Sequence, residues 1–185
     1  MPNELDWATL IQQIREGECA PILGAGTSFG VPPLGAELAG ILLQMEETRT
    51  NIRSPIAERD VLAKVSQYLA VRRKDNVWPK KRIADYLKSQ VRPDVSLRET
   101  YQVLAQLGLP IYLTTNYDDF TVAALRTVRA DVHQEFTRWT SPLLEDHPSV
   151  FDSGFLPDHD HPVVFHLYGH WDITKSLGSR SNKSL

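Results

Sequence analysis

The chain has 185 residues, of which 42% are hydrophobic and 23% charged, which is ordinary for a globular protein and long enough for one domain with a substantial core. Twenty Lys and Arg face 23 Asp and Glu, so the formal charge of −3 argues against direct nucleic-acid binding as the main role. The single cysteine, Cys19, excludes a disulfide framework or a four-cysteine zinc module within the chain. We expect Cys19 to pack as a small apolar residue.

Hydropathy excludes a helical membrane span. No apolar run reaches the roughly 18 to 20 residues that a span requires, and the N-terminus lacks the apolar segment of a signal peptide. The sequence therefore predicts a protein without a membrane segment and with a cytoplasmic location.

The first part of the chain predicts a helix, a strand and a glycine turn. Apolar residues at helical spacing indicate a helix over 7–14, with Asp6 as its N-cap and Gly17 as its stop. Residues 20–23 then form a short apolar run typical of a buried strand. This strand leads directly into the turn at 24–28, with the sequence Gly-Ala-Gly-Thr-Ser.

The glycine turn is suited to a phosphate. Gly24 and Gly26 leave the backbone without side chains where a bulky ligand would approach it. The apolar repeat over 34–44 predicts a helix behind the turn, and a helix N-terminus offers free N–H groups and a positive dipole to an anion. However, the spacing to Gly30 is one residue off the dinucleotide fingerprint, and a tight turn needs glycines in any case. The turn alone therefore leaves nucleotide binding open.

The middle of the chain predicts a helical insertion between two strands. The polar stretch 46–54 indicates a loop, and helices are expected over 58–73, 83–91 and 98–107, the last of them capped by Gly108.

Two basic clusters, 72–74 and 80–82, flank Trp78 in this insertion. An aromatic residue between basic runs suits an anionic ligand. A solvated connection between two helices is the commoner explanation, and it is the one we expect.

The last third predicts two or three further strands. Residues 110–115 form a strand that ends in Asn116-Tyr117-Asp118-Asp119. Residues 162–168 form another, which runs into Gly169-His170. The remaining expected elements are a helix over 120–128, a possible strand over 132–137 and an irregular segment over 141–161.

Three further features are expected to have no role in catalysis or metal binding. His166 alternates with apolar residues along its strand and is expected to be packed rather than catalytic. The run 158–161, Asp-His-Asp-His, has the composition of a metal site, but prolines bracket it and adjacent residues seldom converge on one ion, so a solvated loop is expected. Residues 1–175 are predicted to be one domain, and the serine-rich segment 176–185 a tail or the stump of a longer protein.

Three strands thus end in polar turns, at 24–28, 114–118 and 168–170. If the sheet is parallel, all three turns lie at one edge, where open α/β sheets bind ligands. The predicted fold is accordingly α/β: a Rossmann-like parallel sheet flanked by helices, with a helical insertion. A purely structural role remains open for each turn, because Asn116 and Asp118 could cap the following helix and His170 could be a turn residue.

These motifs resemble the sirtuin-like NAD-binding superfamily, in which an early Gly-Ala-Gly-x-Ser turn is followed by Thr-x-Asn-x-Asp and a Gly-His pair. The likeness is closest to the sirtuin-like NADase domains of bacterial anti-phage defence proteins, whose second motif is typically Thr-Thr-Asn-Tyr-Asp. It spans about residues 5–175. The resemblance implies that Asn116 binds the nicotinamide ribose or the attacking water, that Asp118 lies near the nicotinamide, that His170 is the base, and that Gly24, Ala25, Gly26, Thr27 and Ser28 surround the NAD phosphates and ribose.

The residue types agree with this chemistry. Cleavage of the nicotinamide–ribose bond builds positive charge on the sugar, so a base that deprotonates a ribose hydroxyl or water assists it. Histidine, with an ordinary pKa near 6.5, is largely neutral at cytoplasmic pH and can accept a proton. Asn116 can donate and accept hydrogen bonds without titrating, which suits a neutral sugar.

Two departures from the family refine the expectation. Deacylating sirtuins carry a Gly-Ile-Pro-Asp-Phe-Arg segment and a four-cysteine zinc module; residues 29–33 here read Phe-Gly-Val-Pro-Pro and the cysteines are missing, which makes a deacylase less favoured and leaves no metal expected. Family members also continue into further strands, whereas this sequence stops 15 residues after His170. We therefore expect the adenosine side of the pocket to need a longer chain or self-association.

The sequence thus predicts hydrolysis of NAD, as substrate, to nicotinamide and ADP-ribose by an effector of anti-phage defence. The expected assembly is a homo-oligomer or a complex with further domains or a sensor subunit. The alternative is a non-catalytic module that senses NAD or ADP-ribose.

Overall fold

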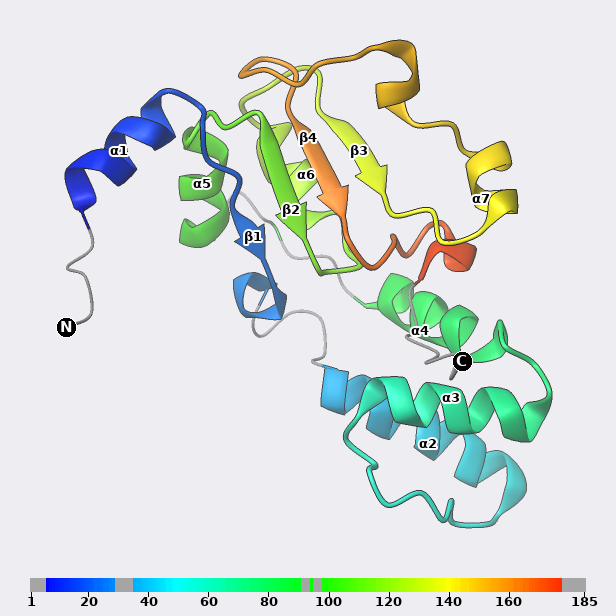
Figure 1. The fold of residues 1–185 in the computed structure, drawn as a ribbon. Coiled ribbons are helices and arrows are strands. Elements are labelled where there is room, and N and C mark those ends of the chain that lie inside the picture. Colours follow the sequence, from blue (N-terminus) through cyan, green and yellow to red (C-terminus); the bar gives the residue numbers. More distant parts are fainter. Residues whose placement is uncertain (1–5, 29–34, 91–93, 95–97, 178–185) are drawn as a thin grey trace.

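The computed structural model describes residues 6–28, 35–90, 94 and 98–177. Within them, seven α-helices flank a four-stranded, all-parallel sheet, so the predicted Rossmann-like α/β fold is confirmed (Figure 1). The strands are β1 (Ile22–Leu23), β2 (Ile111–Thr114), β3 (His133–Phe136) and β4 (Val163–His166). The helices are α1 (Trp7–Arg15), α2 (Gly35–Thr50), α3 (Leu62–Arg73), α4 (Trp78–Ser89), α5 (Glu99–Gln106), α6 (Phe120–Leu125) and α7 (Ser141–Asp146), with 3-10 turns η1 (Ala25–Ser28), η3 (Val150–Ser153) and η4 (Thr174–Ser176).

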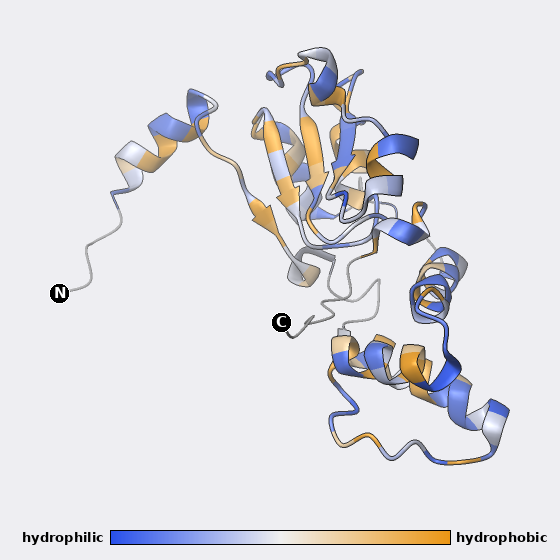
Figure 2. Cartoon of the chain, turned by 45° about the vertical axis from the view of Figure 1, so that its right-hand side comes forward, coloured by the Kyte–Doolittle hydropathy of each residue, from blue (hydrophilic) through white to orange (hydrophobic). Residues whose placement is uncertain are grey.

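The sheet has the strand order β1-β2-β4-β3, with β2 and β4 at its centre. Their residues Tyr112, Val163 and Val164 are fully buried, and hydrophobic residues of the sheet stand out in orange in Figure 2. Pairing is in register, so Leu23, Thr114 and His166 lie side by side at the ends of three strands. The carboxyl ends of these strands therefore share one edge, as the sequence predicted.

Aromatic packing joins the helices behind the sheet to the loop that follows β4. Phe120 of α6 meets Tyr101 of α5 edge-to-face, with ring centroids 6.4 Å apart. The same ring meets Trp171 edge-to-face at 5.8 Å. Because Tyr101 and Trp171 are both buried, the Gly169-His170 turn is anchored by its neighbour to the main core.

The predicted helical insertion is present, but its first helix is longer than expected. Helices α2, α3 and α4 form a lobe beside the sheet (Figure 1). The predicted loop at 46–54 is wrong for its first half, because α2 continues to Thr50. The cause is Glu46, which is fully buried and bonds to Arg49 one turn later, with the two side chains 2.8 Å apart. A polar sequence thus forms a helix through a buried carboxylate.

Glu46 also ties α2 to α3. Arg73 Nε donates to Glu46 Oε2 at 2.9 Å, and Arg72 Nε lies 3.5 Å from Oε1. The pKa of Glu46 is lowered, first by the hydrogen bond from Arg49 and then by Arg73, against the opposing effect of burial. The carboxylate therefore stays ionised where it is buried.

Helix α4 begins five residues before the predicted start at 83. Asp75 Oδ1 accepts the N–H groups of Val77 and Trp78 at 2.9 and 3.0 Å, and Pro79 occupies the first turn, where its missing N–H costs nothing. The guanidinium of Arg73 lies 3.7 Å from the centroid of Trp78. The residues 74–77 between α3 and α4 are all exposed, so the expected solvated connection is confirmed, while Trp78 at the start of α4 packs against the partly buried Arg73.

Three predicted helix ends are confirmed. Asp6 Oδ1 accepts the N–H of Thr9 at 3.2 Å, and Gly17 and Gly108 take the left-handed φ values +75° and +65° after their helices. The segment 141–161, expected to be irregular, contains α7 and η3 instead. Helix α6 is shorter than predicted, the possible strand over 132–137 is β3, and α3 begins at Leu62 rather than 58.

The predicted boundary between residues 175 and 176 falls inside a packed turn. Ser176 and Leu177 are both buried, and Ser176 closes η4 against the chain that follows β4. Residues 178–185, the rest of the predicted tail, lie outside the described residues.

Two expectations from composition can be compared with this structure. Cys19 is half-buried and packs against the core, as predicted. None of the helices in the described part of the chain has the length and hydrophobicity that crossing a bilayer requires.

Candidate functional site at the carboxyl edge of the sheet

The glycine turn after β1 is a tight, self-bonded loop. The N–H and hydroxyl of Thr27 both donate to the carbonyl of Gly24, at 2.9 and 2.7 Å. The turn passes into η1, so the expected α-helix does not directly follow it; residues 29–34 lie outside the described part. Ala25 and Gly26 are exposed, and no described atom lies within 4 Å of a Cβ placed on Gly26. Neither packing nor a left-handed φ requires glycine at this position, so its backbone is open to a ligand.

Asn116 joins the second turn to the first. Its side chain is buried, and its Nδ2 lies 3.2 Å from the carbonyl of Gly24 and 3.1 Å from Oγ of Ser28. A carbonyl can only accept, so the nitrogen of the amide faces Gly24. The side chain therefore crosses from β2 to the turn after β1 and does not cap α6.

Ser28 lies at the centre of a buried cluster of polar side chains. Its Oγ accepts from Asn116, lies 2.5 Å from the hydroxyl of Tyr101, and lies 3.4 Å from Oδ2 of Asp118. Tyr101 was not predicted as a site residue. Its helix could be read from the sequence, but its contact with Ser28, 73 positions away, had no local signal. Burial and the nearby Asp118 both raise the pKa of Tyr101, so it remains a neutral phenol.

Asp118 is the carboxylate in this hydrogen-bonded cluster. It is buried, and burial raises its pKa to about 6, against the lowering effect of the N–H of Phe120, which donates to Oδ1 at 3.1 Å. That bond to the start of α6 shows that the capping role considered for Asp118 is real. Its other oxygen nonetheless faces Ser28, so Asp118 belongs to both the helix end and the site.

His170 lies at the same edge and is held from several sides. Its backbone N–H donates to Ser176 Oγ at 2.9 Å, and its ring nitrogen Nδ1 accepts the backbone N–H of Asp172 at 3.3 Å. Because a backbone N–H can only donate, Nδ1 carries the lone pair and, in the neutral ring, Nε2 carries the proton. Nε2 lies 3.5 Å from Nε2 of Gln134, and Asp172 Oδ2 lies 3.8 Å from Nδ1.

Gly169 makes this turn possible. Its φ is +91°, and a Cβ there would overlap the carbonyl oxygen of Ser176. The Gly-His pair is therefore a structural requirement as well as a motif, and it fixes where the ring of His170 lies.

His166 stands between His170 and Asn116. It is fully buried at the end of β4, as the predicted packing role required. Its Nδ1 lies 3.1 Å from the carbonyl oxygen of Asn116, and its ring meets that of His170 edge-to-face with centroids 4.8 Å apart. Burial and the neighbouring His170 lower the pKa of His166 to about 4. The structure thus brings all three predicted turns into one cluster.

The acidic-histidine run 158–161 lies elsewhere and forms an exposed loop, as expected. Asp158 Oδ1 accepts the N–H groups of Asp160 and His161 and lies 2.9 Å from His161 Nδ1. Its carboxylate is thus used within the turn. Among the residues that the structure describes, no group of three or more His, Cys, Asp or Glu side chains is arranged to hold a metal ion.

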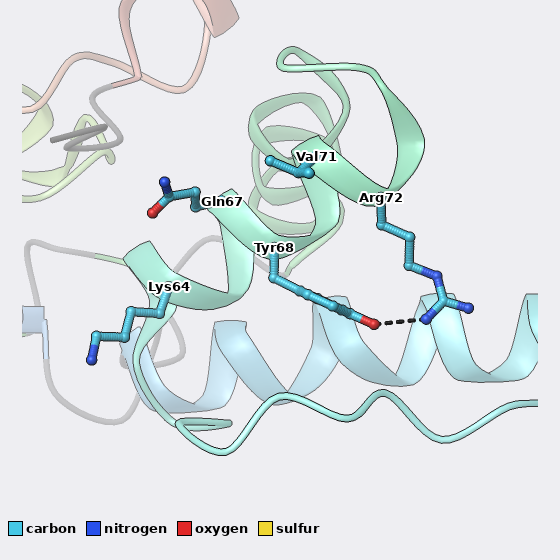
Figure 3. Close-up of a pocket in the computed structure, with 5 residues that line it drawn as sticks. All are labelled: Lys64, Gln67, Tyr68, Val71 and Arg72. Atoms are coloured by element: carbon cyan, nitrogen blue, oxygen red, sulfur yellow. Dashed lines mark hydrogen bonds between the residues drawn. The ribbon is translucent and has the colours of Figure 1, made fainter. Parts of the chain in front are cut away.

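A separate open pocket of about 470 Å³ lies on α3, in the helical lobe (Figure 3). All five of its lining side chains come from that helix, and the hydroxyl of Tyr68 accepts from Arg72 at 2.6 Å. The Nζ of Lys64 is paired with Glu58. The pocket is thus apart from the sheet edge, and its two cations already have partners.

Comparison with known proteins adds no assignment. No protein-family model matches the chain, and no curated protein is significantly similar to it.

Proposed function

We propose that this chain is an NAD hydrolase that releases nicotinamide and ADP-ribose. The observation that carries the proposal is the convergence of the three turns: Asn116 bonds to the glycine turn, and His166 contacts both Asn116 and His170. This convergence matches the motif order that the chain shares with sirtuin-like NADases. The proposed setting is the cytoplasm of a bacterium, as the effector of an anti-phage defence system that depletes NAD.

The proposed reaction uses these residues as follows. Water adds to the anomeric carbon of the nicotinamide ribose, the bond from that carbon to nicotinamide breaks, and the electron pair leaves with nicotinamide. His170 accepts the proton at Nδ1 in place of the hydrogen bond from the backbone N–H of Asp172, and the carboxylate of Asp172 faces the resulting cation. Asn116 orients the water or the ribose hydroxyl. Gly24 and Gly26 allow the diphosphate to approach the backbone, and Asp118 faces the nicotinamide.

Incubation with NAD and quantification of free nicotinamide tests the proposal. His170→Ala and Asn116→Ala should each lower turnover about 100- to 10,000-fold, or roughly 3 to 5.5 kcal/mol of barrier. Cys19→Ser, which alters a half-buried residue outside the cluster, should retain wild-type turnover. Near-native turnover in a folded His170→Ala protein would remove His170 from the reaction.

A second function, a non-catalytic sensor of NAD or ADP-ribose, is favoured by one observation. The amide of Asn116 and the Nδ1 of His170 are both already bonded within the chain. Binding of NAD without release of nicotinamide, at protein concentrations spanning a hundredfold range, would establish the sensor. Activity that rises more steeply than linearly with concentration would instead indicate that self-association completes the proposed site.

A further inference from the structure

The backbone of Asn116 is held on both sides by side chains at the ends of two neighbouring strands. Its N–H donates to Thr114 Oγ1 at 3.0 Å, and its carbonyl lies 3.1 Å from His166 Nδ1. Thr114 and His166 are in register across β2 and β4. The backbone of Asn116 is thus clamped by two side chains that point from the same row of the sheet.

The clamp fixes the tautomer of His166. A carbonyl oxygen can only accept, so Nδ1 of His166 carries a proton and donates it to Asn116. In the neutral ring the lone pair is then on Nε2. That nitrogen is buried and has no hydrogen-bond partner. A buried acceptor without a partner destabilises the fold, and an aromatic hydrocarbon at this position would avoid that loss. Packing alone therefore does not account for histidine here.

We infer that His166 is a positioning residue of the NAD-cleaving site. Its Nδ1–H holds the backbone of Asn116 in place, and its ring packs edge-to-face against the ring of His170. The inference rests on the proposed function, because it assigns a role toward Asn116 and His170. Because the backbone of Asn116 is held in place, its side-chain amide stays directed at Gly24 and Ser28. A displacement of about 1 Å in such a group costs on the order of 100-fold in rate.

Two substitutions separate the donor from the bulk of the ring. His166→Phe keeps a ring but removes the donor, whereas His166→Asn places an amide nitrogen near the position of Nδ1. We expect kcat for NAD cleavage to fall about 100-fold in His166→Phe with KM changed less than threefold, and to stay within about tenfold of wild type in His166→Asn. Equal activities in the two variants, whether both high or both low, would overturn the inference.

A readout without turnover separates this inference from the proposed function. In ¹⁵N spectra, the side-chain amide resonances of Asn116 should move in His166→Phe and stay near their wild-type positions in His166→Asn. Long-range nitrogen–proton spectra of the wild-type protein should show His166 protonated at Nδ1 and bare at Nε2. Unmoved Asn116 resonances in folded His166→Phe, or the opposite wild-type tautomer, would overturn the positioning role. If the Asn116 resonances and the His166 tautomer are as expected but the wild-type protein releases no nicotinamide, only the proposed function is overturned.

Discussion

Two buried carboxylates, one in the helical lobe and one at the sheet edge, are treated in opposite ways. Glu46 is surrounded by Arg49, Arg72 and Arg73, and its pKa is lowered. Asp118 bonds to a backbone N–H and faces a serine hydroxyl, and its pKa is raised to about 6. Burial opposes ionisation of both groups, but Glu46 has arginines beside it, whereas the carboxylate of Asp119 raises the pKa of Asp118 further.

The difference separates structural from functional use of charge. In the lobe, a carboxylate whose charge is balanced by arginines joins two helices and stays ionised over the whole physiological range. At the sheet edge, a buried carboxylate with no cation among the causes of its pKa shift can change its protonation near neutral pH, which is a property that active sites share. Each of the following variants tests one side of this contrast.

The largest expected effect is loss of the lobe carboxylate. Glu46→Gln should lower the free energy of unfolding by about 3 kcal/mol, because it leaves three arginines together around a neutral group. Glu58→Gln, which removes an exposed pair with Lys64, should change it by less than about 1 kcal/mol. Denaturant titration of both proteins measures the difference, and equal losses would contradict the structural role of Glu46.

The second effect concerns pH. The folded pKa of Asp118 lies above its unfolded value of 3.8, so the folded state binds more protons and loses stability as pH rises from about 4 to 6. His166 has a folded pKa of about 4, below its unfolded 6.5, so the unfolded state binds more protons and the fold gains stability over the same range. Each contribution is on the order of 3 kcal/mol, and the two oppose each other.

Single substitutions should therefore reveal opposite slopes. Relative to wild type, Asp118→Asn should become more stable as pH rises from about 4 to 6, because it removes the group that loses stability. His166→Asn should become less stable over the same range. Urea unfolding at a series of pH values gives both slopes, and slopes of the same sign in the two variants would contradict the pKa assignments.

A smaller effect is expected at the clamp on Asn116. Thr114→Val preserves shape but leaves the buried N–H of Asn116 without its acceptor, which should cost about 1–3 kcal/mol. Thr115→Val is the matched control, since the Thr115 hydroxyl donates to the Leu23 carbonyl, which also accepts the Thr115 N–H. Thermal unfolding that showed equal destabilisation of the two variants would exclude a special role for Thr114.

The smallest effect on folding is expected at Gly26. Gly26→Ala should change stability by less than about 0.5 kcal/mol, because a Cβ there meets no described atom, and it should weaken NAD binding at least tenfold if the diphosphate approaches this backbone. Gly40→Ala, at another open glycine in α2, should leave NAD binding unchanged. Titration calorimetry with NAD distinguishes the two, and equal affinities would place the diphosphate elsewhere.

Local sequence patterns were sufficient for the sheet and its turns. Apolar runs and capping glycines such as Gly108 report on the chain near themselves, so the parallel strands and their polar ends could be predicted. They could not predict that Glu46 is buried, because its partner Arg73 lies 27 positions away and its own segment is as polar as a loop.

The same limit applies within the candidate site. Asn116 and His170 were identified from their motifs, and their meeting at one edge followed from the parallel sheet. The bond from His166 to Asn116 joins residues 50 positions apart, and the contact of Tyr101 with Ser28 joins residues 73 apart. Such contacts depend on tertiary packing, so no local pattern predicts them.

The turn around Gly169 also determines how the chain opens. Ser176 accepts the N–H of His170, Tyr117 accepts that of Trp171, and Ile173 accepts that of Ser176. The bonds of His170 and Ser176 lie within the segment 169–176, whereas that of Trp171 joins the segment to the turn after β2. We therefore expect the Trp171 amide hydrogen to exchange with deuterated solvent only when the segment detaches from that turn, and the other two only when the turn around Gly169 itself unfolds.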